Sequence, residues 1–134
     1  MKPILTLLVI FSFVSCSKYE QGPNFTLASK RSRMINTWQI TKIETSNSVQ
    51  YFSEGERVFT FYRNDDFSLQ YDLQGYSYSE FGSWALADEK EYLDIVVSDW
   101  YGGEYWYSFK IIKLKSNELI LKTQDDEYWT LRTY

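Results

Sequence analysis

Histidine is missing from this chain of 134 residues, and cysteine occurs only once, at position 16. Histidine is the commonest general acid and base at neutral pH and the commonest metal ligand in proteins. Its absence excludes Ser-His-Asp and Cys-His nucleophilic sites and every histidine-based zinc site. A single cysteine also leaves no disulfide within the chain, so the stability of the fold must come from its apolar core.

Basic side chains are outnumbered by acidic ones, 14 to 18, which gives a formal net charge of −4. Nucleic-acid binding needs a positively charged stripe that neutralises phosphates, so we expect no nucleic-acid partner. Apolar residues make up 44% of the sequence and aromatic residues 19%. In a chain of this length, that composition indicates one domain with a substantial core.

The first sixteen residues, MKPILTLLVIFSFVSC, differ in composition from the rest of the chain. They contain Lys2 and then an apolar run from Ile4 to Val14, which is about half the length that a membrane-spanning helix needs. Such a segment is typical of an export signal. Its end, Phe13-Val14-Ser15-Cys16, resembles a bacterial lipobox, which implies cleavage before Cys16 and lipidation of that cysteine. The alternative is an ordinary signal peptide with an incidental cysteine.

The expected organisation therefore has three parts: residues 1–15 as a lipoprotein signal peptide, residues 16–25 as the lipidated cysteine and a polar tether, and residues 26–134 as one folded domain. Two or more acyl chains would hold the protein firmly at a membrane. Ser17 replaces the aspartate that retains Gram-negative lipoproteins in the inner membrane. We therefore expect an outer-membrane location, on either its periplasmic or its surface face.

Helical spacing is confined to a short segment after the tether. Thr26 is the expected N-cap and Asn36 the expected end of this helix. Its apolar side carries Leu27, Ala28, Met34 and Ile35. Its basic side carries Lys30, Arg31 and Arg33, for which a solvated face is favoured over contact with anionic lipid head groups.

After Asn36 the sequence alternates between apolar and polar residues, which is the pattern of half-buried strands. Eight strands are expected: Thr37–Glu44, Arg57–Arg63, Phe67–Asp72, Tyr78–Leu86, Tyr92–Asp99, Glu104–Leu114, Glu118–Thr123 and Tyr128–Thr133. Short connections make neighbouring strands antiparallel, and closing the sheet removes its exposed edges. The sequence thus predicts an all-β protein, an eight-stranded antiparallel up-and-down barrel with a short N-terminal helix.

The segment DWYGGEYWY, at residues 99–107, reads as the tip of a hairpin. A three-residue loop with Gly103 in the left-handed position pairs Val97 with Tyr107 and Asp99 with Tyr105, and keeps aliphatic residues on the inner face. On this register Tyr105 and Tyr107 belong to the core.

The outward face of the hairpin carries Trp100 and Trp106. They would either contact a protein, sugar or membrane, or simply cover the rim of the barrel by packing across the strands. Asp99 would either meet the head of a ligand or hydrogen-bond a tyrosine hydroxyl. The residues expected to contact a ligand are Asp99, Tyr105, Tyr107, Phe61 and Tyr71.

The element Asn36-Thr37-Trp38 and Arg132 in the last strand resemble the pattern of calycins, the group that contains the lipocalins, with Asn36 in place of a glycine. The segments TFYRNDDFSL, GSWAL, YLDIVV and SFKIIKLKSNELIL likewise resemble small lipocalin-like lipoproteins of Bacteroidota. The resemblance implies a lipocalin-like barrel in which Arg132 stacks over the indole of Trp38 and closes one end. Lipocalins carry small apolar molecules, and no catalytic residue carries over.

Three classes of function follow from these observations. The first is a membrane-anchored monomer that binds a small apolar or amphipathic ligand in the barrel, without a cofactor or metal. The alternative is an inhibitor, immunity or envelope-assembly protein with a filled barrel and a working rim at Trp100 and Trp106. An enzyme is not expected: glycoside hydrolysis needs only two carboxylates, but no spacing singles out a pair among the acidic residues.

Overall fold

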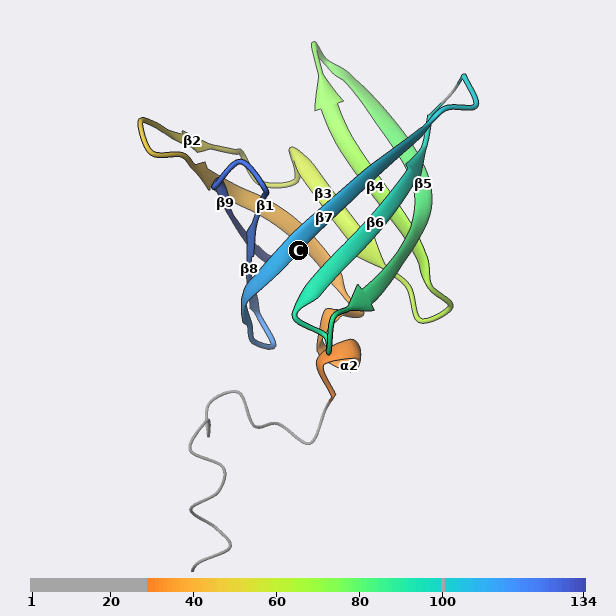
Figure 1. The fold of residues 1–134 in the computed structure, drawn as a ribbon. Helices are drawn as coiled ribbons and strands as arrows, with labels where there is room; N and C mark the ends of the chain where they lie inside the picture. The colour runs from red at the N-terminus through yellow and green to blue at the C-terminus, as the bar shows by residue number, and fades with distance from the viewer. Residues whose placement is uncertain (1–28, 100) are drawn as a thin grey trace, which may run out of the picture.

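A computed structural model describes residues 29–99 and 101–134 of the chain (Figure 1). Cys16, the expected signal peptide, the tether and Trp100 lie outside the described residues. No helix within the described ranges is both long and apolar enough to span a membrane.

The described chain is almost entirely β-structure. The strands are β1 (Thr37–Glu44), β2 (Val49–Tyr51), β3 (Arg57–Phe61), β4 (Asp66–Leu73), β5 (Tyr76–Ala87), β6 (Tyr92–Ser98), β7 (Glu104–Leu114), β8 (Glu118–Lys122) and β9 (Tyr128–Thr133). All eight predicted strands are present, and the bounds of β1, β7 and β9 match the prediction residue for residue. Strand β2 was not predicted, because its three residues are all exposed and give no alternating pattern.

Eight of the strands close into an antiparallel barrel in the order β1-β3-β4-β5-β6-β7-β8-β9, with β9 pairing back to β1 (Figure 1). Strand β1 makes the closure by pairing with β9 along almost its whole length, from Trp38 to Glu44. Its other edge is shared: Thr37–Gln39 pair with β3, and Lys42–Glu44 pair with the extra strand β2. The barrel therefore has no open edge along β1.

The core fills the barrel because alternate residues of each strand point inward. Strand β6 shows the pattern clearly: Leu93, Ile95 and Val97 are buried, and the residues between them are partly exposed. Gly82 of β5 lies where two strands approach closely, since a Cβ there would come within 1.7 Å of the carbonyl oxygen of Val96. Only glycine fits this position without a shift of the backbone.

A short helix, α2 (Lys30–Met34), lies at one end of the barrel (Figure 1). Its N-cap is Ser29, whose hydroxyl accepts a hydrogen bond of 3.1 Å from the backbone N–H of Ser32. The predicted N-cap, Thr26, is therefore wrong for this helix and lies outside the described residues. Met34 is fully buried, and its carbonyl accepts a 3.1 Å hydrogen bond from the indole of Trp38. The helix thus plugs this end.

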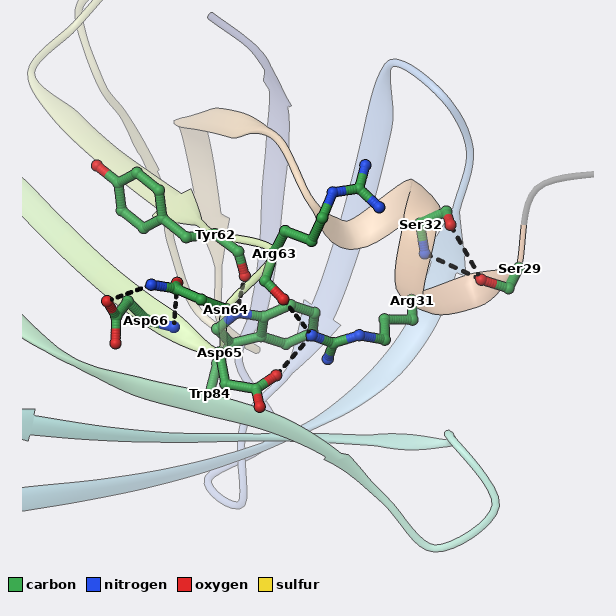
Figure 2. A network of polar contacts seen from close by, with 9 residues as sticks. All are labelled: Ser29, Arg31, Ser32, Tyr62, Arg63, Asn64, Asp65, Asp66 and Trp84. Atoms are coloured by element: carbon green, nitrogen blue, oxygen red, sulfur yellow. Dashed lines mark hydrogen bonds and ion pairs between the residues drawn. The ribbon is translucent and has the colours of Figure 1, made fainter.

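The cation that covers an indole at the plugged end is Arg31, not Arg132. The guanidinium of Arg31 lies 4.7 Å from the ring centroid of Trp84 and also pairs with Asp65 Oδ1 at 2.5 Å (Figure 2). The Trp84 indole donates to the carbonyl of Tyr62 at 2.9 Å, which fixes the ring beneath the guanidinium. Arg31 thereby joins the helix to β5 and to the loop between β3 and β4.

Arg132 lies elsewhere because of its register. It pairs with Gln39, the residue after Trp38, so its side chain lies on the outer face of β9 while the indole points inward. There its guanidinium lies 3.5 Å from the carboxylate of Glu118. The predicted stacking of Arg132 on Trp38 is therefore wrong, although Trp38 is fully buried at the plugged end.

The basic face of the helix is not simply solvated. Arg33 donates to the carbonyl of Leu114 at 2.9 Å, and Lys30 donates to the carbonyl of Lys90 at 3.0 Å. The three cations predicted to face solvent therefore attach the helix to the barrel.

We expect Arg31→Ala to lower the free energy of unfolding by about 1 kcal/mol, because it removes the cation–π contact with Trp84 and leaves the plug held by fewer bonds. Arg132→Ala, the matched control, should cost less than about 0.5 kcal/mol, because it removes only an exposed ion pair. Urea unfolding of both variants measures the difference. A larger loss for Arg132→Ala would restore it as the closing residue.

Candidate functional site

The barrel encloses a cavity of about 250 Å³. Its wall is built from inward-facing residues of seven strands: Ile40, Arg57, Phe59, Phe67, Leu69, Tyr71, Glu80, Ile95, Val97, Tyr107, Phe109 and Trp129. Of the residues predicted to contact a ligand, Tyr71 and Tyr107 lie on this wall, and Phe61, Asp99 and Tyr105 do not. The side chains inside the barrel thus leave a small cavity and do not fill the interior completely.

An aromatic cluster forms the inner part of the cavity. Phe59 packs edge-on against Phe67 with ring centroids 5.4 Å apart, and Phe109 packs against Trp129 at 5.2 Å. Phe61 lies toward the plugged end, almost completely buried and edge-on to Trp84 at 5.4 Å. Phe61 therefore fills the closed end of the barrel, and the aromatic wall of the cavity is formed by residues farther from the helix.

Three polar side chains of adjacent strands face the cavity. Arg57 of β3 pairs in register with Tyr71 of β4, and Glu80 of β5 pairs with Leu69, the inward neighbour of Tyr71. Burial raises the pKa of the Tyr71 phenol, and the negative charge of Glu80 raises it further. A hydrogen bond to Glu80 is a further cause, so the Tyr71 phenol stays protonated across the physiological pH range and donates to that carboxylate.

Trp129 supplies the one cavity-lining donor that is buried without a partner. Its indole nitrogen is shielded from solvent and has no hydrogen-bond partner among the described residues. Buried indole N–H groups normally find an acceptor, because leaving one unpaired is costly. Because this nitrogen is covered on the cavity side as well, an oxygen of a bound molecule would reach it only after the indole ring turned.

The hairpin between β6 and β7 has the predicted three-residue loop, but the loop begins one residue earlier. Asp99 N–H donates to the carbonyl of Gly103 at 2.9 Å, and Gly102, with φ of +81°, takes the left-handed position predicted for Gly103. Val97 consequently pairs with Tyr105 instead of Tyr107. A shift of two residues keeps every side chain on its predicted face, which is why alternation could not detect it.

Asp99 closes this loop. Its carboxylate accepts hydrogen bonds from the backbone N–H groups of Tyr101 at 2.9 Å and Gly103 at 2.6 Å. The charge of the same carboxylate, with hydrogen bonding as a second cause, raises the pKa of Tyr105. Asp99 is thus placed to order the tip of the hairpin, outside the cavity wall.

The aromatic residues after the loop are more exposed than predicted. Tyr105 is 49% exposed and Tyr107 45%, so their assignment to the core is wrong although both lie on the inward face. The hairpin extends past the neighbouring strand β8, which leaves these rings without cover on one side. Trp106 lies on the outward face and is 73% exposed. Trp100 lies outside the described residues.

Arg57 and Glu80 were not predicted as site residues. Both are charged residues at positions where alternation points inward, which was the signal available in the sequence. No group of three or more His, Cys, Asp or Glu side chains within the described ranges is placed to hold a metal ion.

Comparison with solved structures shows the fold. A lipocalin-like protein from Bacteroides uniformis ATCC 8492 superposes with a TM-score of 0.63 at 16% identity, over 76% of this chain and 99% of that one. An uncharacterized protein from Bacteroides eggerthii DSM 20697 gives 0.61 at 16% identity, over 75% and 99%. No protein-family model and no curated protein matches the sequence. The chain therefore has a lipocalin-like fold, as the sequence resemblance predicted.

We expect Trp106→Ala to change the free energy of unfolding by less than about 0.5 kcal/mol, since most of its ring already lies in solvent. Trp38→Ala, at the fully buried indole, should cost about 3–5 kcal/mol. Thermal or urea unfolding of the two variants makes the comparison. A large loss for Trp106→Ala would mean that the outer face of β7 is covered in solution.

Proposed function

We propose that the barrel binds a small amphipathic molecule in its cavity. The observation that supports this most directly is a cavity with an aromatic wall, to which Arg57, Tyr71 and Glu80 add polar side chains. Apolar pockets with a few convergent polar groups are the usual form of small-molecule sites. The lipocalin-like fold makes such a role reasonable but does not identify the ligand.

The size of the cavity limits the ligand. A cavity of about 150 Å³ holds a benzene molecule, so the 250 Å³ in this barrel would hold about ten non-hydrogen atoms. A single substituted ring or a short acyl chain fits this volume. A long-chain fatty acid would have to leave about half of its length outside the cavity.

The polar groups indicate how the ligand would be oriented. The apolar body of the ligand would lie against Phe59, Phe67 and Phe109. The guanidinium of Arg57 offers donors to an oxygen acceptor of the ligand. We infer a ligand with a mainly apolar body and at least one oxygen acceptor.

Binding is proposed in preference to catalysis. Glu80 is the only carboxylate on the cavity wall, whereas hydrolysis of a glycosidic bond by acid and base needs two. The inward-facing polar groups are suited to orienting a molecule, and none of them is paired with a nucleophile.

Native mass spectrometry tests this proposal on a chain that begins at Ser17, so that no N-terminal acyl chain competes for the cavity. We expect an extra mass that is lost on denaturation, or that appears on incubation with small aromatic acids and short-chain fatty acids. Arg57→Met should weaken binding by about tenfold, because it removes the charged donor of the cavity wall and keeps an apolar side chain.

Leu69→Trp, which places a larger ring on the cavity wall, should abolish this binding. Leu73→Trp is its matched control, since Leu73 lies on the same strand but is exposed at the hairpin tip. Equal binding by parent and Leu69→Trp would place the ligand outside the barrel, and a bare mass under all conditions would refute the proposal.

We propose in addition that Cys16 carries a lipid that anchors the barrel to the outer membrane. The sequence supports this through the apolar run, the Phe13-Val14-Ser15-Cys16 element and the absence of any other cysteine. The full-length chain expressed in a Gram-negative host should be recovered from membranes with acyl chains on Cys16. Cys16→Ser should appear in the soluble periplasmic fraction, and a membrane-bound Cys16→Ser protein would contradict the anchor.

A further inference from the structure

Strand β7 is longer than the strand beside it, and half of one of its edges has no neighbour. Its last residues pair with β8, beginning at Lys110. Residues Glu104–Phe109 pair with β6 on one side and, within the described ranges, with nothing on the other. The barrel wall is therefore interrupted between β7 and the loop that joins β8 to β9.

The backbone groups on this edge can be assigned from the hydrogen bonds at the two ends of the ladder. Asp99 N–H donates to Gly103 C=O at 2.9 Å, and Ile111 N–H donates to Glu91 C=O at 2.8 Å. Bonding alternates along an antiparallel pair, so the residues with odd numbers between these ends bond to β6. The N–H and C=O groups of Glu104, Trp106 and Ser108 consequently point toward the unpaired side.

A cleft of about 570 Å³ lies along the same edge. It is lined by Asp94, Trp106, Tyr107, Ser108, Phe109, Thr123, Gln124, Asp125, Glu127 and Trp129. Three of these side chains are carboxylates, four are aromatic, and none is basic. Proteins commonly protect an unpaired edge with lysine, yet Glu104 adds a further negative charge to this one.

We propose that this edge of β7 binds an extended, positively charged peptide segment of a partner protein by strand addition. The partner's backbone would pair with Glu104, Trp106 and Ser108, and its lysine or arginine side chains would face Asp125 and Glu127 and pack on Trp106. Strand addition takes its affinity from main-chain hydrogen bonds and its selectivity from the side chains that alternate along the strand. Carboxylates next to the free edge select a basic strand.

The test uses the full chain in nanodiscs of neutral phosphatidylcholine and fluorescent peptides whose binding is followed by anisotropy. A short peptide of alternating lysine and valine is the probe, and its counterpart of alternating glutamate and valine is the charge control. The lysine peptide should bind at least about tenfold more tightly, and added salt should weaken it. A third peptide, the lysine sequence with N-methyl groups on alternate residues, should lose binding because it cannot pair along its backbone.

Variants of the edge separate backbone pairing from side-chain contact. Ser108→Pro removes an unpaired N–H and should abolish binding, whereas Ser108→Ala keeps the N–H and should bind as the parent does. Asp125→Asn with Glu127→Gln should weaken the lysine peptide and leave the glutamate peptide unchanged. Leu69→Trp should leave the preference for the lysine peptide over the glutamate peptide unchanged, because the charged residues of the cleft lie outside the cavity wall.

Three results would overturn the proposal: no binding of the lysine peptide, equal binding of the lysine and glutamate peptides, or equal binding of the N-methylated peptide. The last of these decides the question even if Ser108→Pro fails to fold, because it leaves the protein unchanged. If the parent chain is a dimer in the nanodisc and the Ser108→Pro variant is a monomer, the edge of β7 binds a second copy of this chain instead of a peptide.

Discussion

Pairing of β1 with β9 is the constraint on which the rest of the structure depends. Without it, the sheet would end in two free strands, and its inner aromatic face would lie open to water. Strand β1 closes the barrel through β9, in a pairing with a register irregularity between Ile40 and Lys42, and its other edge is divided between β3 and β2. The buried rows of Trp38, Ile40 and Leu131 then form a continuous core across the closure. This core must provide the stability that no disulfide supplies.

The two ends of the barrel differ because the elements that meet there differ in length and chemistry. At one end α2 inserts Met34 beneath Trp38, and Arg31 covers Trp84, so the lumen stops at Phe61. At the other end the β6–β7 hairpin extends past the shorter strand β8, which leaves tyrosines exposed and one edge unpaired. A cavity with a closed base and a polar upper wall follows from this asymmetry.

Alternation was enough to predict the eight barrel strands and the closed antiparallel barrel, and the family resemblance added its lipocalin-like character. Alternation was not enough to predict which residues pair across neighbouring strands, or whether the barrel contains a cavity. Registers that differ by two residues place the same side chains inward, so the pairing of Val97 with Tyr105 was missed. The placement of Arg132 over Trp38 had a different source, the family resemblance, and its position opposite Gln39 directs it outward. The volume of the cavity depends on how the large aromatic rings pack against one another. The number of these rings in the sequence does not determine whether they fill the barrel.

The cavity and the cleft share one wall, formed by Tyr107, Phe109 and Trp129. Trp129 is the central member, because it packs on Phe109 and carries the buried unpartnered N–H. A ligand in the cavity would contact this wall from inside the barrel, and a strand added to β7 would contact Phe109 and Tyr107 from outside. Two ligands influence each other only through a group whose arrangement both of them favour. This aromatic wall is the part of the molecule where occupancy of the barrel could alter the surface offered to a partner.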